Sequence, residues 1–192
     1  MNFIFDIGNV LVNYYPFEHL KSLFTDEKLA ERINEAVFKS PDWLRMDHGF
    51  LSAPDATDLF CKREPDIQNE IRLTMKSVNG MFTPIQETID LLPKIKEAGH
   101  KIYFLSNMQH EIRDYLVEKY EFFKLFDGGV YSCDINHIKP SPEIYQFLLN
   151  AYNLNPKDCL FFDDMQPNIT AAEEQGIKSF LFTTADILYS LI

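Results

Sequence analysis

Polar side chains that can do chemistry follow several short apolar runs of this chain. Together with a lysine that precedes a proline, they are Asp6, Ser106, Asn107, Lys139, Asp163 and Asp164. Three carboxylates in one place repel one another unless a cation lies among them. Ligand sets made only of oxygen favour a hard ion such as Mg²⁺. The set therefore predicts a magnesium site, provided that the fold brings these residues together.

The same residues also fit phosphoryl transfer from a small phosphate ester. A phosphate beside the metal needs donors, which the Ser106 hydroxyl, a backbone N–H at a helix start and the Lys139 ammonium can supply. Asp6 would attack the phosphorus and form an aspartyl phosphate, which water then hydrolyses. The metal and Lys139 would have to neutralise the phosphate first, because a carboxylate is a poor nucleophile towards a dianion.

Strands and helices alternate in the second half of the chain. Apolar runs predict strands at 2–6, 101–105, 158–162 and 178–182, and helical spacing predicts helices at 84–98, 141–152 and 166–175, with a last short helix at 185–192. This alternation predicts an α/β fold, with a Rossmann-like, mostly parallel sheet covered by helices on both faces. The carboxyl ends of such strands converge on one crevice.

Residues 16–83 break this alternation, because their apolar residues fall at helical spacing throughout. We expect a small helical insertion after the first strand. The catalytic core would then consist of residues 1–15 and 84–192.

Composition excludes several classes of protein. The chain has 192 residues and 18 Lys and Arg against 29 Asp and Glu, so its net charge of −11 disfavours nucleic acid and anionic membranes as partners. No run approaches the roughly 20 apolar residues of a membrane span. Cys61, Cys133 and Cys159 have no CxxC spacing and are expected to be buried, reduced thiols. We expect a soluble cytoplasmic protein, either a monomer or a weak dimer.

The candidate residues lie in four motifs, Phe5 to Val10, Phe104 to Asn107, Ile138 to Tyr145 and Phe161 to Asn168. In this order and spacing they resemble the haloacid dehalogenase superfamily, subfamily IA, on its phosphatase side. The bacterial glucose-1-phosphatase-like branch is the most similar in its Asp-x-Gly-Asn start and Asp-Asp-x-x-x-Asn finish. The insertion corresponds to that family's cap domain, and Asp47 to Ser52 resembles the cap turn of this branch.

The resemblance implies a role for each acidic residue. Asp6 is expected to be the nucleophile and a metal ligand, and the carbonyl of Gly8 a second ligand. Asp164 would bind the metal directly, whereas Asp163 would either pair with Lys139 or reach the metal through water.

The resemblance also implies how the phosphate is held. Ser106 and Asn107 would bind the transferring phosphoryl group, and Lys139 would offset the charge on this group and on Asp6. Asn168 would orient one carboxylate of the adjacent acid pair.

One position departs from the family pattern. Most phosphatases of the superfamily carry an acid two residues after the nucleophile, where this chain has Gly8. Because general acid–base catalysis contributes about 10² to 10⁴-fold, the loss favours substrates with good leaving groups, such as hexose 1-phosphates. Asn9, Asn13 and His48 are the nearest substitutes in sequence, but an amide cannot transfer protons and His48 depends on cap closure.

Two other functions remain open. The chain could be a catalytically weak phosphate-binding or regulatory protein that lost turnover with the acid at position 8. A haloacid dehalogenase is less favoured, because that chemistry needs no cation and the pair Asp163 and Asp164 indicates one. Under the insertion, a sugar-sized pocket could be lined by the aromatic residues Tyr14, Tyr15, Phe17, Trp43 and Phe50.

Overall fold

A five-stranded parallel sheet forms the centre of the computed structural model, which describes all residues from 1 to 192. Its strands are β1 (Asn2–Phe5), β2 (Lys101–Ser106), β3 (Gly128–Tyr131), β4 (Cys159–Asp163) and β5 (Lys178–Leu181). The spatial order is β3-β2-β1-β4-β5, and every neighbouring pair is parallel. The predicted α/β fold is confirmed.

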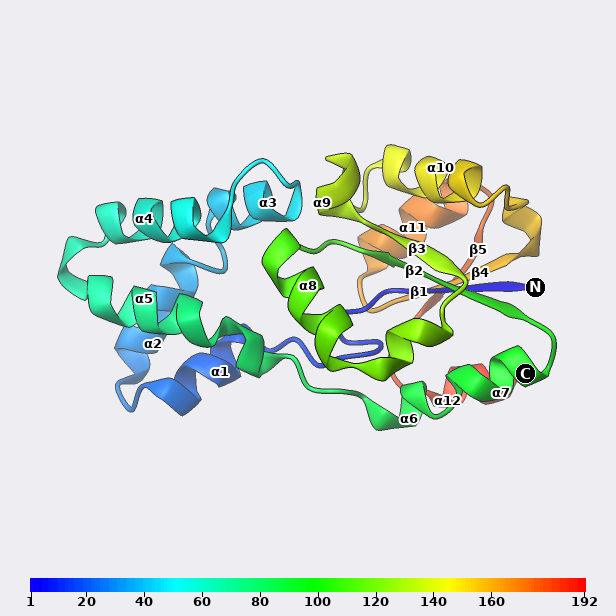
Figure 1. Cartoon of the computed structure of the whole chain (residues 1–192), viewed down its shortest axis with the longest axis horizontal. Helices are drawn as coiled ribbons and strands as arrows, with labels where there is room; N and C mark the ends of the chain where they lie inside the picture. The colour runs from blue at the N-terminus through cyan, green and yellow to red at the C-terminus, as the bar shows by residue number, and fades with distance from the viewer.

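Helices cover both faces of this sheet (Figure 1). They are α7 (Leu92–Glu97), α8 (His110–Lys119), α10 (Pro142–Ala151), α11 (Gln166–Glu174) and α12 (Asp186–Tyr189). Successive side chains of a strand point to opposite faces. Phe3 and Phe5 of β1 accordingly pack in the hydrophobic cluster that includes α7, α8 and α12, whereas Ile4 packs with α10 and α11.

The helix predicted at 84–98 is wrong as a single element. It is divided into α6 (Gln86–Ile89) and α7, and Pro93 lies in the first turn of α7. Proline has no N–H to donate and its ring clashes with the preceding turn, so it starts a helix more readily than it continues one. The helices predicted at 141–152, 166–175 and 185–192 are confirmed as α10, α11 and α12.

Residues 16–81 form helices only, as the spacing predicted. They are α1 (Pro16–Leu23), α2 (Glu27–Ala36), α3 (Pro41–Asp47), α4 (Ala53–Arg63) and α5 (Gln68–Ser77), with 3-10 turns η1 (Pro65–Ile67) and η2 (Val78–Met81). Figure 1 shows these helices at one end of the sheet, opposite the end where β1 begins. Because the strands are parallel, all their carboxyl ends point towards this group.

The two ends of the helical insertion are fastened to each other. The backbone N–H of Asn13 donates to the carbonyl of Thr83 at 2.7 Å, and that of Ile85 donates to the carbonyl of Leu11 at 2.8 Å. These bonds flank an antiparallel bridge between Val12 and Pro84. The division of the chain into a core and a cap near these residues remains our prediction.

The insertion nevertheless shares a hydrophobic core with the sheet. One cluster of buried side chains runs from Phe5 of β1 to Leu20 of α1, Ile33 of α2 and Phe60 of α4. Packing of this kind favours cooperative folding of the two parts, because neither part buries its apolar face alone.

The remaining elements are short. They are α9 (Ser132–Ile135), which directly follows β3, and the 3-10 turns η3 (Glu121–Leu125) and η4 (Pro156–Asp158). The three cysteines are buried and unpaired, as predicted. Among all the helices, none combines the length and the apolar character needed to cross a membrane.

Candidate active site

The carboxyl ends of β1 and β4 bring the predicted acidic residues together. Phe5 lies in register with Phe162 of β4, so that Asp6 and Asp163 follow on neighbouring strands. The backbone N–H of Asp6 donates to the Phe162 carbonyl at 2.8 Å. Carboxylate oxygens of Asp6, Asp163 and Asp164 all lie within 4.8 Å of one another. The sheet order, with β1 beside β4, is therefore what assembles the acidic cluster.

Lys139 reaches this cluster from the loop before α10. Its Nζ atom lies 2.8 Å from Oδ1 of Asp6 and 2.6 Å from Oδ2 of Asp163, and its side chain is 1% exposed. Asp163 is held further by the Asn168 amide, at 2.9 and 3.1 Å, and by the backbone N–H of Met165 at 2.8 Å. Of the two arrangements that the resemblance left open for Asp163, the structure has the pair with Lys139.

The side chain of Asn107 is engaged by the lysine loop. Its Nδ2 donates to the Lys139 carbonyl at 2.9 Å, and its Oδ1 accepts from the Lys139 backbone N–H at 2.7 Å. This two-way bond fixes the backbone of Lys139, a role that the sequence did not suggest. Ser106 ends β2, is buried and lines the same pocket as Asp6 and Lys139.

Burial and neighbouring charges shift the pKa values of both Asp6 and Lys139. Burial raises the pKa of Asp6 to about 7, opposed by Lys139 and reinforced by the charge of Asp163. Burial alone would lower the pKa of Lys139, but the Asp163 and Asp6 carboxylates together raise it above its usual value. A cation beside Asp6 would lower the pKa of this carboxyl again and keep it ionised, as an attacking group must be.

Asn9 connects the turn after β1 to Asp164. Its Nδ2 donates to Oδ2 of Asp164 at 2.9 Å, while its Oδ1 accepts from the backbone N–H of Tyr14 at 2.9 Å. Asn9 has a φ of 53°, a left-handed conformation that asparagine tolerates better than most residues. By sequence, Asn9 was among the nearest residues to the missing acid, although its amide cannot transfer protons; in the structure this amide orients Asp164.

The donor set fits a hard divalent cation. The three carboxyl groups of Asp6, Asp163 and Asp164 face a single ammonium group, that of Lys139, so the cluster offers more acidic groups than cations. All the carboxylate ligands are oxygens, and Asp164 is only partly buried, which leaves a way in for an ion. Asp6, Asp164 and the carbonyl of Gly8 are the residues that would hold Mg²⁺.

A cavity of about 560 Å³ opens above these residues, between the strand ends and the helical insertion. Much of its wall is apolar, with Tyr14, Phe38, Trp43, Leu44, Phe82, Met108, Ile112, Ile138 and Met165. Of the aromatic residues predicted to line a pocket, Tyr14 and Trp43 do so. Tyr15, Phe17 and Phe50 are not part of this wall.

Two polar residues in this wall were missed by sequence reasoning. The amide nitrogen of Gln109 is buried and has no hydrogen-bond partner. Asp47, at the end of α3, also lines the cavity. Asp47 and His48 both belong to the cap-turn motif, but only the folded chain shows that Asp47 lines the cavity and His48 does not. Nδ1 of His48 instead lies 3.1 Å from the Asn136 carbonyl.

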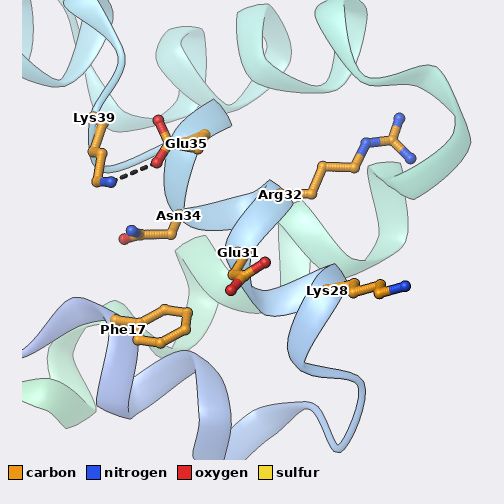
Figure 2. A pocket seen from close by; sticks show the side chains of 7 residues that line it. All are labelled: Phe17, Lys28, Glu31, Arg32, Asn34, Glu35 and Lys39. Carbon is orange, nitrogen blue, oxygen red and sulfur yellow. Dashed lines mark hydrogen bonds and ion pairs between the residues drawn. The ribbon is translucent and has the colours of Figure 1, made fainter.

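A second hollow, of about 640 Å³, lies on the outer surface of the insertion. Figure 2 shows its wall, formed mainly by side chains of α2 that project separately and not towards one point. Lys39 is paired with Glu35, and Arg32 with Glu64. This hollow contains none of the predicted site residues, so we assign the chemistry to the cavity at the strand ends.

A cluster of His110, Cys133 and Asp134 also brings possible ligand atoms within 4.8 Å of one another. Arg113 already forms an ion pair with Asp134. Burial raises the pKa of the Cys133 thiol to about 12, so it is not a thiolate at neutral pH. The cluster therefore lacks the deprotonated, cation-free ligands of a zinc site.

A comparison with protein families identifies the class of this fold and site. The family model of haloacid dehalogenase-like hydrolases matches residues 1–176. Since the match covers most of the chain, the protein belongs to the haloacid dehalogenase-like hydrolase family.

Individual relatives include two phosphatases. The sesquiterpene phosphatase of Aspergillus oryzae is 24% identical over 184 residues, which cover 94% of this chain and 88% of that protein. The D-ribitol-5-phosphate phosphatase of Bacteroides thetaiotaomicron is 26% identical over 196 aligned positions, covering 93% and 90%. The glucose-1-phosphatase-like branch is not among these names and remains a prediction.

Solved structures share the fold. The HAD family enzyme bt-2542 of Bacteroides thetaiotaomicron, in complex with magnesium and inorganic phosphate, superposes with a TM-score of 0.78 at 21% identity, covering 98% of both chains. At this level of identity the likeness establishes a common architecture.

Proposed function

We propose that this protein is a Mg²⁺-dependent phosphatase that hydrolyses small phosphorylated metabolites through an aspartyl phosphate on Asp6. The observation that carries the proposal is the position of Asp6 at the floor of the cavity, 2.8 Å from the Lys139 ammonium and beside two further carboxylates. Two relatives named as phosphatases support it, as does a structural neighbour in complex with magnesium and inorganic phosphate.

Each residue would have a defined part in the reaction. Mg²⁺ supplies charge neutralisation of the phosphoryl oxygens when it is bound. An oxygen of Asp6 attacks the phosphorus, and the bond between phosphorus and the leaving alcohol breaks. Lys139 stays beside Asp6 and offsets the charge of the transferring group, while Asn107 holds the lysine loop in place. Water then attacks the phosphorus and releases phosphate and free Asp6.

The residues of the cavity wall limit the kinds of leaving group that we propose for the substrate. Its aromatic and aliphatic side chains favour a leaving group with an apolar face. The unpartnered amide of Gln109 favours an oxygen on that leaving group, because a buried donor without a partner costs about 1 to 3 kcal/mol. A hexose 1-phosphate offers ring carbons and hydroxyl groups and remains our specific candidate.

The test is a hydrolysis screen with p-nitrophenyl phosphate, hexose 1- and 6-phosphates, a pentitol 5-phosphate and a prenyl phosphate. We expect phosphate release that requires Mg²⁺ and that falls by more than about 10³-fold in Asp6→Asn. A protein that binds phosphate but hydrolyses nothing would instead be the weak phosphate-binding alternative. Metal-independent release of halide from 2-haloacids would identify a dehalogenase.

A further inference from the structure

Asp47 is the only acid of the cavity wall that lies outside the acidic cluster at the strand ends. The other acids of the wall are Asp6 and Asp164. The Asp47 carboxylate forms no hydrogen bond and no ion pair, although its neighbour in α3, Asp42, is paired with both Arg45 and Arg63. A carboxyl group that faces a reaction cavity without a partner has its proton available for transfer.

The backbone of Asp47 is fastened to the catalytic core. The Ser132 hydroxyl donates to the Asp47 carbonyl at 2.5 Å and accepts from the backbone N–H of Met108 at 2.9 Å. Met108 directly follows Ser106 and Asn107, the residues predicted to bind phosphate. A chain of two hydrogen bonds therefore links the acid of the insertion to the phosphate end of the cavity.

The residues after Asp47 are fixed in the same way. Nδ2 of Asn136 donates to the His48 carbonyl at 2.6 Å. Gly49 has a φ of +75° and packs so closely that an added Cβ would lie 2.3 Å from the Cys133 carbonyl oxygen. The position of Asp47 is thus set by contacts of its own carbonyl and of the two residues that follow it.

The surroundings of the carboxyl group favour its protonated form. Asp47 as a whole keeps some exposure to the cavity, but burial of its carboxyl raises the pKa of this group to about 7. The ionisable groups that face it from neighbouring elements are Tyr14 and Cys133, and burial raises the pKa of both well above neutrality. Lys139, across the cavity, is already paired with Asp6 and Asp163.

We propose that Asp47 is the general acid and base of the reaction and does the work of the acid that is absent at position 8. The inference rests on the proposed phosphatase function. In the first step, Asp6 attacks, the bond from phosphorus to the leaving oxygen breaks, and that oxygen takes the proton of Asp47. In the second, the Asp47 carboxylate takes a proton from water, whose oxygen attacks phosphorus as the bond to Asp6 breaks. The sum is ester plus water to alcohol plus phosphate.

This assignment reverses an expectation drawn from Gly8. Without an acid, the enzyme would be restricted to good leaving groups. With Asp47 in place, it also hydrolyses simple alkyl phosphates, whose leaving oxygen must be protonated as it departs.

The experiment compares Asp47→Asn with the wild type on n-butyl phosphate and p-nitrophenyl phosphate, with Mg²⁺, in rapid-mixing experiments. For the variant we expect phosphorylation by butyl phosphate to slow by at least about 100-fold. With p-nitrophenyl phosphate, it should release a burst of about one equivalent of nitrophenol per enzyme and then turn over slowly, because water activation is also lost. Asp47→Glu, which keeps a carboxyl group, should recover part of the butyl phosphate activity.

Asp58→Asn is the matched control. Asp58 is an acid of the insertion whose side chain is 71% exposed and which lies outside the cavity wall. We expect it to leave both reactions unchanged. A wild type that hydrolyses p-nitrophenyl but not butyl phosphate would overturn the assignment, as would an Asp47→Asn variant that slows both first steps equally or neither. Wild-type inactivity on every ester would overturn the phosphatase function itself.

The pH dependence gives a second readout. Because Asp47 must be protonated to donate, the butyl to p-nitrophenyl ratio of phosphorylation rates should fall as pH rises through about 7. Both substrates need Asp6 in its ionised form, so the titration of Asp6 affects both rates equally and cancels in their ratio. Asp47→Asn should show a ratio that does not vary with pH, and a ratio that still falls in this variant would contradict the proposal.

Discussion

The ammonium group of Lys139 lies between two buried carboxylates, those of Asp6 and Asp163. Lys139→Met leaves both charges without their cation, and we expect it to lower the free energy of unfolding by about 3 to 5 kcal/mol in the absence of metal. The loss should be largest above pH 7 and smaller near pH 5. The folded-state pKa of Asp6 is already raised and would rise further, so the folded variant retains a proton that the unfolded chain releases near pH 4.

Urea denaturation in EDTA at pH 5 and pH 8 measures this effect. Lys124→Met is the control, because the Lys124 side chain is 73% exposed and pairs only with exposed Glu121. Equal losses at the two pH values for Lys139→Met would contradict the electrostatic explanation.

Gln109 gives a prediction about substrate binding. Gln109→Leu removes a buried donor that has no partner in the free protein, so we expect the free energy of unfolding to stay the same or to rise by about 1 kcal/mol. KM for the best hydroxyl-bearing substrate of the screen should rise about 5-fold with little change in kcat, as expected for loss of one hydrogen bond. An equal rise for n-butyl phosphate would show that the amide does not contact the leaving group.

Much of this residue-level picture was predictable from sequence, but not all of it. Most of the site residues stand at strand ends or beside a motif proline, and parallel strands bring such positions together. They are Asp6, Ser106, Lys139 and Asp163. Asp47 lies on a helix whose distance from the strand ends depends on tertiary packing, which no local pattern encodes.

At the scale of elements, the turn after α3 is one of the contacts that align the insertion with the sheet. Gly49→Ala should lower the free energy of unfolding by more than the roughly 1 to 2 kcal/mol that a left-handed alanine costs, because its Cβ would meet the Cys133 carbonyl. It should also lower kcat on butyl phosphate by displacing Asp47. Gly99→Ala is the control, since Gly99 has a φ of +83° with nothing within 4 Å of the added Cβ.

Urea denaturation and steady-state kinetics on the two alanine variants separate strain from displacement. Gly99→Ala should lose stability only. Should Gly49→Ala keep the wild-type kcat, the turn would not be what aligns Asp47.

Secondary structure was predicted well where hydrophobic periodicity was strong. The strand β3 was missed because Gly128 and Gly129 supply half of it and carry no side chains to show an alternating pattern. Gly129 is required there, as an added Cβ would lie 2.4 Å from the Phe104 ring. The break between α6 and α7 was missed because apolar spacing continues through Pro93 and concealed its effect on the backbone.

At the scale of the whole molecule, the shared hydrophobic cluster predicts a single unfolding transition. Trp43 is the only tryptophan and lies in α3 of the insertion, so its fluorescence reports on that part, whereas far-UV circular dichroism reports on all helices and strands. We expect the two urea denaturation curves to coincide. A fluorescence transition at lower urea would show that the insertion unfolds independently.

Metal binding should stabilise the entire fold, because the acidic cluster joins β1 to β4. At a Mg²⁺ concentration 100 times the dissociation constant, the free energy of unfolding should rise by about 2.7 kcal/mol. Asp164→Ala should reduce this gain while changing the metal-free stability little, since Asp164 is only partly buried. A stabilisation by Mg²⁺ that persists undiminished in Asp164→Ala would place the ion elsewhere.

The bond between Asn13 and Thr83 makes the insertion removable in principle. Asn13 and Thr83 flank residues 14–82 and are joined by a backbone hydrogen bond. A two-residue hairpin turn could therefore link Asn13 to Thr83 without moving a strand. The shortened chain would keep the residues of the acidic floor but expose to water the sheet side chains that now pack against the insertion. Its urea denaturation, set beside that of the full chain, would measure how much a roof over the reaction contributes to the stability of the core.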